Sequence, residues 1–175
     1  MTDILKLNAV RASIEACATR YQRDTGEVKL IAVSKTRSAE EVLSLHHAGQ
    51  QRFGENYLQE ALAKIEALGG YPVEWHFIGA IQSKKAAQIA QNFSWVHSLD
   101  RLKVANKLNQ HADPARPLNV LIQVNLEGES SKGGVNPADL NDLALAVDAL
   151  QNLNLRGLMF MPKVHHEFEA QRAVF

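Results

Sequence analysis

The sequence contains very little cysteine and has no long apolar run. Cys17 is the single cysteine among 175 residues. It can form no disulfide within the chain and no cysteine-based zinc site, and this usage fits a reducing compartment. No segment approaches the roughly 18 consecutive apolar residues that a membrane helix needs. The charged N-terminal segment also lacks the apolar core of a signal peptide. We therefore expect a cytoplasmic protein with no membrane partner.

The chain also lacks an excess of charge of either sign. It has 19 Lys plus Arg and 19 Asp plus Glu. Nucleic-acid-binding domains usually carry a basic face, so we expect no nucleic-acid partner. The sequence contains no GxSxG, HExxH or complete Walker A motif. Neither histidine pair, His46–His47 or His165–His166, has a third ligand placed to complete a site, so we expect no metal.

The spacing of apolar residues predicts an N-terminal helix over 2–23, followed by six strand–helix units. The strands are expected at 28–36, 51–57, 73–80, 94–99, 117–126 and 153–161, and the helices at 38–49, 58–70, 83–93, 100–112, 137–153 and from 165 onward. Ser38 and Glu41 form a capping-box pattern, and Gly49 is a typical helix stop. Regular alternation of strand and helix predicts a parallel sheet with right-handed crossovers.

Polar or small residues stand at the carboxyl end of each expected strand. They are Lys35, Asn56, His76, Ser98, Asn125 and residues 159–162. A (β/α)₈ barrel builds its site from the ends of many strands, whereas a doubly wound sheet binds ligands at its switch point. The pattern favours the TIM-like barrel. A complete barrel usually needs about 200 residues or more. We therefore expect one domain, 1–175, with only about six of the βα units.

Lys35 is the most informative candidate. It closes an otherwise apolar strand in the segment AVSKT. A lysine amine buried at such a place is a nucleophile that can form a Schiff base with an aldehyde. The alternative is that Lys35 reaches solvent or pairs with Glu55, and position alone slightly favours this alternative.

Three further segments carry candidate residues. In FGENY, Asn56 could hydrogen-bond a ring hydroxyl, but Gly-Glu-Asn is also turn chemistry. In WHFIG, His76 is either a hydrogen-bonded core residue, which its apolar strand favours, or a residue of the site. The loop ESSKGGV either forms a backbone nest for an anion or is simply a flexible connection.

The sequence resembles the YggS/PROSC family of pyridoxal phosphate homeostasis proteins in a set of short motifs and in their order. These motifs are AVSKT, FGENY, WHFIG with QSKK, SKGG and LRGLM. The resemblance covers about residues 4–162. It implies the fold type III barrel of the alanine racemase N-terminal domain. It also implies pyridoxal 5′-phosphate held as a Schiff base on Lys35, without catalytic turnover. Asn56, His76, Met159 and, as an accessory contact, Lys132 would line the cofactor site.

This resemblance leaves alternative functions open. Family members continue through two further βα units, which supply groups that contact the cofactor phosphate. Each such charge-assisted bond contributes about 1.5–3 kcal/mol to binding of the cofactor phosphate. One alternative is therefore a form that lacks these bonds, does not bind the cofactor and acts through protein partners. The second alternative is a racemase or decarboxylase that uses the same cofactor. As partners we expect pyridoxal phosphate and apoenzymes that depend on it. Open sheet edges suggest a monomer or weak dimer.

Overall fold

The computed structural model describes residues 2–128, 133–163 and 166–174, and the chain divides into two compact units, 1–76 and 77–175. The helices are α1 (Asp3–Arg20), α2 (Ala39–His47), α3 (Leu58–Ala67), α4 (Ala86–Asn92), α5 (Leu102–His111), α6 (Leu140–Asp148) and α7 (Phe168–Val174). The strands are β1 (Ala32–Val33), β2 (Arg52–Glu55), β3 (Glu74–Phe77), β4 (Trp95–Leu99), β5 (Leu118–Gln123) and β6 (Leu153–Met159). Short 3-10 helices, η1 (Ser83–Lys85) and η2 (Pro137–Asp139), precede α4 and α6.

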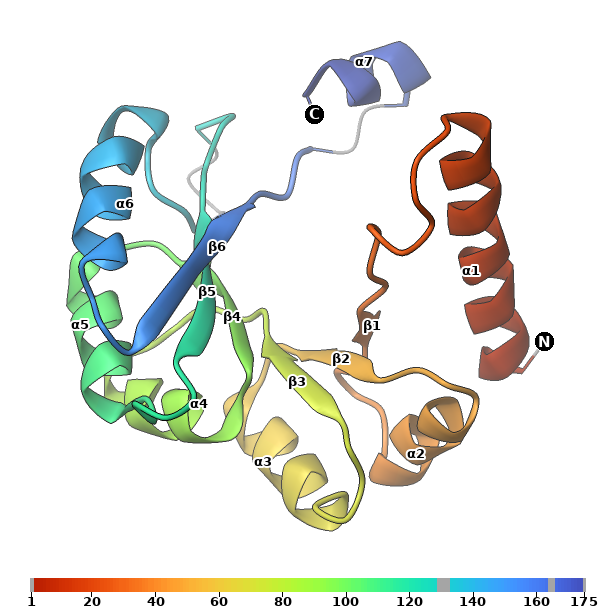
Figure 1. The fold of residues 1–175 in the computed structure, drawn as a ribbon, viewed down its shortest axis with the longest axis horizontal. Coiled ribbons are helices and arrows are strands. Elements are labelled where there is room, and N and C mark those ends of the chain that lie inside the picture. Colours follow the sequence, from red (N-terminus) through yellow and green to blue (C-terminus); the bar gives the residue numbers. More distant parts are fainter. Residues whose placement is uncertain (1, 129–132, 164–165, 175) are drawn as a thin grey trace. The chain divides into compact units, whose positions relative to one another are not determined.

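The strands lie in the sheet in the same order as in the chain, from β1 to β6 (Figure 1). A doubly wound sheet reverses its strand order at a switch point, whereas barrel strands follow one another in sequence. The order therefore confirms the prediction of a barrel-like fold with six βα units. Among the residues described, no helix is both long and apolar enough to cross a bilayer.

In the first unit, helices α2 and α3 pack on one face of the strands. Alternation along β2 turns Phe53 and Glu55 toward this helical layer, where both are buried. The Phe53 ring contacts that of Trp75, with 6.1 Å between the ring centroids. The Ser38 capping box at the start of α2 is formed as predicted, and Gly49 follows the end of that helix with φ of 84°. The opposite face of the strands is therefore left for polar residues.

The second unit has its apolar core between β4–β6 and helices α4–α6. Val96, Val120 and Ile122 are fully buried in the strands. Val104 and Leu108 face them from α5 and are also fully buried. The six predicted units are thus present, and most element ends differ from the predicted ends by a few residues.

The strand predicted over 28–36 is the main correction. Only Ala32 and Val33 form strand pairs, with Phe53 and Gly54 of β2. Among the described residues, β1 is paired with β2 alone. The apolar run suggested burial on both faces, but the Val33 side chain is 52% exposed.

Candidate functional site

Lys35 lies at the centre of a tight turn that follows β1. The Arg37 backbone N–H donates to the carbonyl oxygen of Ser34 at 3.1 Å, which closes the turn around Lys35 and Thr36. The Lys35 side chain is exposed. The Lys35 side chain therefore reaches solvent at this turn, and the burial that its apolar strand suggested is not found. The reason is that β1 ends at Val33, two residues before the lysine.

Asn56 occupies the matching position after β2. Val33 pairs with Gly54 in the parallel register, and two residues further on come Lys35 and Asn56. Lys35 and Asn56 therefore follow equivalent positions of two neighbouring parallel strands. The Asn56 Oδ1 atom is buried and has no hydrogen-bond partner within the part of the chain that the structure describes. Unpaired buried acceptors are costly, so this oxygen is suited to a polar group from a ligand.

His76 is buried in β3, as its apolar surroundings indicate. Its Nε2 atom lies 2.9 Å from Glu74 Oε1, which also accepts a 2.9 Å bond from Arg52 Nε. Burial lowers the pKa of His76 below its ordinary value, and the hydrogen bond to Glu74 opposes this shift only in part. The contact between Arg52 and Glu74 shows that β2 and β3 present these side chains on the same face. By alternation, His76 and Asn56 share that face too.

Glu55 does not pair with Lys35. It points into the layer between the strands and α3, where it is fully buried and lies 2.7 Å from the Nζ atom of Lys64. The same Nζ donates to the Ser34 carbonyl oxygen and to Glu60 Oε1, at 2.6 Å each. The Ser34 hydroxyl donates to Glu55 Oε1 at 2.6 Å. The side chains of Glu55, Glu60 and Lys64 therefore form a charged cluster between α3 and the turn that carries Lys35.

Sequence reasoning did not find Lys64 and Glu60. Their spacing of four residues is that of an ordinary ion pair on a helix surface. One signal was available. Ala61, Lys64 and Leu68 recur at helical spacing, so Lys64 falls on the buried stripe of α3, where a lysine needs a partner.

Met159 ends β6 in the second unit, and a bulge determines its orientation. Val120 of β5 pairs with Leu155, but Leu121 pairs with Gly157, so β6 contains one extra residue. Gly157 has φ of 140°, which suits glycine. The bulge turns Met159 to the face of Gln123, with which it is in register. Strict alternation from Leu153 would have placed it on the opposite face.

The SKGG segment lies only partly within the described residues, and Lys132 lies outside them. Gly134 has φ of 129°, and a Cβ atom there would come within 2.8 Å of the Asn125 backbone nitrogen. Val135 N donates to the Gln123 carbonyl at 2.8 Å, and Asn125 N donates to the Val135 carbonyl at 3.0 Å. Glycine is therefore required where this loop returns along the end of β5.

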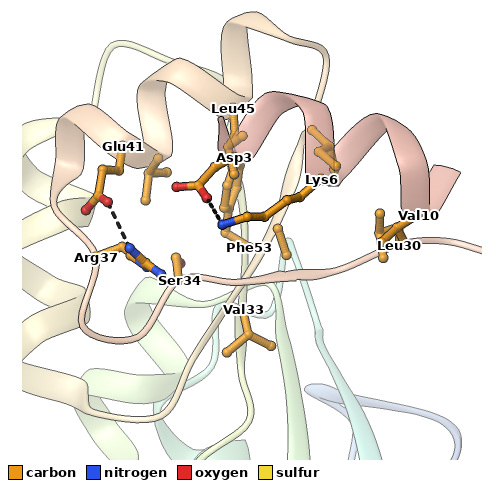
Figure 2. Close-up of a pocket in the computed structure, with 13 residues that line it drawn as sticks. Asp3, Lys6, Val10, Leu30, Val33, Ser34, Arg37, Glu41, Leu45 and Phe53 are labelled. Carbon is orange, nitrogen blue, oxygen red and sulfur yellow. Dashed lines mark hydrogen bonds and ion pairs between the residues drawn. The ribbon is translucent and has the colours of Figure 1, made fainter. Parts of the chain in front are cut away.

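A separate cavity of about 270 Å³ lies among α1, β1 and α2. Figure 2 shows two ion pairs at its wall, Lys6–Asp3 at 2.9 Å and Arg37–Glu41 at 3.1 Å. Most of the other lining side chains are apolar. The predicted residues Lys35, Asn56 and His76 are not among those that line it. All three nevertheless belong to the first unit, where His76 lies in β3 and where Lys35 and Asn56 follow β1 and β2.

Comparison with known proteins connects this arrangement to a family. The model of the family "Alanine racemase, N-terminal domain" matches residues 5–175. The pyridoxal phosphate homeostasis protein of Pseudomonas aeruginosa is 52% identical over 167 residues, which are 95% of this chain and 73% of that protein. The protein of the same name from Escherichia coli K12 is 47% identical, covering 98% and 75% of the two chains.

Solved structures agree with these sequence matches. The structure of PipY from Synechococcus elongatus with pyridoxal phosphate bound superposes with a TM-score of 0.79 at 33% identity, covering 92% of this chain and 76% of PipY. An alanine racemase from E. faecalis has a TM-score of 0.62 at 18% identity, covering 86% of this chain and 41% of the racemase, and shows the fold alone.

The fold and the matched domain define an α/β protein of the alanine racemase N-terminal type. Within that class, the chain belongs to the family of pyridoxal phosphate homeostasis proteins. The resemblance indicated by AVSKT, FGENY and the later motifs is thus confirmed.

Proposed function

We propose that this protein binds pyridoxal 5′-phosphate through Lys35 and serves in the intracellular homeostasis of that cofactor. The aldehyde carbon of the cofactor condenses with a primary amine, with loss of water. Lys35 supplies an exposed amine at the end of β1. The observation that carries the proposal is this amine after β1 together with Asn56, which follows the neighbouring strand β2 and whose buried Oδ1 has no hydrogen-bond partner among the described residues.

The neighbouring residues suit a polar aromatic ligand. Asn56 Oδ1 would accept a hydrogen bond from a ring hydroxyl. Burial lowers the pKa of His76 below its ordinary value, which favours the neutral imidazole on β3. The family resemblance adds Met159 and Lys132 to the residues proposed to bind the cofactor.

The role we propose is that of a carrier without turnover. The relatives from Pseudomonas aeruginosa and Escherichia coli are named for homeostasis of the cofactor. The alanine racemase similarity supports the fold alone, and the chain covers only 41% of the E. faecalis enzyme. Apoenzymes that depend on pyridoxal phosphate are the proposed recipients.

An absorption titration with pyridoxal phosphate tests the binding residue. The wild-type protein should develop the absorption band of a lysine-linked cofactor, and Lys35→Ala should not develop it. Lys29→Ala is the matched control, because Lys29 is another exposed lysine of the first unit. It should behave as the wild type does. An equal band in Lys35→Ala would assign the linkage to a different amine and refute the role of Lys35.

A second assay separates the carrier from an enzyme. Protein loaded with pyridoxal phosphate is incubated with L-alanine, and formation of D-alanine is followed by chiral chromatography. We expect no D-alanine above the level given by free cofactor. Racemisation that is lost in Lys35→Ala would replace the carrier role with that of a racemase.

A further inference from the structure

Thr36, the residue after Lys35, has an unusual backbone conformation. Its φ of 64° lies in the left-handed region, at the third position of the turn that begins at Ser34. Turns with a positive φ at this position usually carry Gly or Asn there. A β-branched residue is strained in this region and remains there only when its surroundings hold it. The structure should therefore contain a group that restrains Thr36.

Glu60 of α3 is that group. The Thr36 backbone N–H donates to Glu60 Oε1 at 2.5 Å, and the same oxygen accepts a 2.6 Å bond from Lys64 Nζ. The hydrogen bond from Lys64 holds the pKa of Glu60 below its ordinary value, and the bond from the Thr36 amide acts in the same direction. Glu60 is therefore a charged acceptor aimed at the turn.

The residue on the other side of Lys35 is restrained by the same cluster. The Ser34 carbonyl oxygen accepts a hydrogen bond from Lys64 Nζ, and the Ser34 hydroxyl donates a hydrogen bond to the buried Glu55. The Ser34 backbone N–H also donates to the Gly54 carbonyl at 2.9 Å. Both neighbours of Lys35 are thus held by β2 and α3, while the Lys35 side chain itself is exposed.

We infer that Glu60 and Lys64 are positioning residues for Lys35. Their hydrogen bonds to the backbone of Thr36 and Ser34 hold the turn in one conformation. The Lys35 amine is therefore presented from a single backbone conformation at the carboxyl end of β1. Fixing the backbone before the ligand arrives removes an ordering cost that binding would otherwise carry. This inference rests on the proposed function, because it assumes that Lys35 is the amine that binds pyridoxal phosphate.

Substitutions at Glu60 test the inference with little risk to the fold, because its side chain is 29% exposed. Glu60→Ala removes the acceptor of the Thr36 amide and should lower the affinity for pyridoxal phosphate about tenfold, which corresponds to the cost of ordering one further side chain. Glu60→Gln keeps an acceptor oxygen and should retain most of the affinity. Glu66→Ala, at an exposed glutamate of the same helix, is the matched control.

Amide hydrogen exchange of Thr36, measured by NMR in the protein without cofactor, gives an independent readout. Exchange should become faster in Glu60→Ala, and should stay slow in Glu60→Gln and Glu66→Ala, with unfolding in urea little changed. Wild-type affinity in Glu60→Ala, or equal losses in the Ala and Gln variants, would overturn the inference.

Failure of the wild-type protein itself to bind pyridoxal phosphate would instead refute the proposed function. The exchange measurement would then decide the remaining point. Faster exchange in Glu60→Ala alone would support restraint of the turn by Glu60, and equal exchange in all variants would refute it.

Discussion

At the scale of single residues, burial determines the pH behaviour of His76. Its folded pKa lies below the ordinary value of 6.5, chiefly because the side chain is buried. A base with a depressed folded pKa contributes stability that is fully present above the unfolded pKa. As the pH falls below about 6.5, the unfolded chain takes up a proton that the folded chain does not, and this stability is lost.

We therefore expect the free energy of unfolding to fall between pH 7.5 and pH 5.5, and to fall less in His76→Gln. Urea unfolding at the two pH values measures both changes. His166→Gln, at an exposed histidine, should keep the wild-type dependence. An equal fall in the free energy of unfolding in all three proteins would show that His76 does not cause the loss of stability between pH 7.5 and pH 5.5.

Thr36 is a second residue whose effect is local. Glycine adopts positive φ without a Cβ clash, which relieves about 1–2 kcal/mol, while its greater freedom in the unfolded chain costs about 0.5–1 kcal/mol. Thr36→Gly should thus raise the free energy of unfolding by up to about 1.5 kcal/mol. Thr25→Gly, in an exposed turn where φ is not positive, should lower it. A loss of stability in Thr36→Gly would mean that the left-handed conformation carries no strain.

At the scale of elements, the sequence allowed the order of helices and strands to be predicted, but not the contacts between them. Apolar periodicity and the Ser38 capping box are local features, so α2 and most other elements could be found. The bulge before Gly157 and the burial of Lys64 depend on a neighbouring strand and on the sheet. The pairing of Glu55 with Lys64 rather than with Lys35 could not be found for the same reason.

The buried pair between β2 and α3 gives a prediction at this scale. Lys64→Met leaves the carboxylate of Glu55 buried without its cation and should cost about 3–5 kcal/mol. The double variant Glu55→Gln with Lys64→Met should recover part of that loss, because no buried charge remains. Lys6→Met, which breaks an exposed pair on α1, should change stability little. Urea unfolding of the wild type, both single variants, the double variant and Lys6→Met measures these differences. Additive effects of Glu55→Gln and Lys64→Met would contradict the coupling.

At the scale of the whole molecule, the family could be identified from several short motifs in a fixed order. The sequential strand order agrees with the barrel expected from polar residues at successive strand ends. Within the first unit, Lys35 and Asn56 follow the neighbouring strands β1 and β2. The contacts around the Lys35 turn, by contrast, came only from the structure, because the spacing of Glu60 and Lys64 is that of an ordinary ion pair along a helix and does not show that both contact this turn.

The most direct test of this account is to find where the cofactor attaches. Wild-type protein is incubated with pyridoxal phosphate, reduced with borohydride, digested, and mapped by mass spectrometry. We predict that the reduced cofactor is found on Lys35, and that neither Lys29 nor Lys64 carries it. Attachment spread over several exposed lysines, or absent from Lys35, would contradict the claim that this turn holds pyridoxal phosphate.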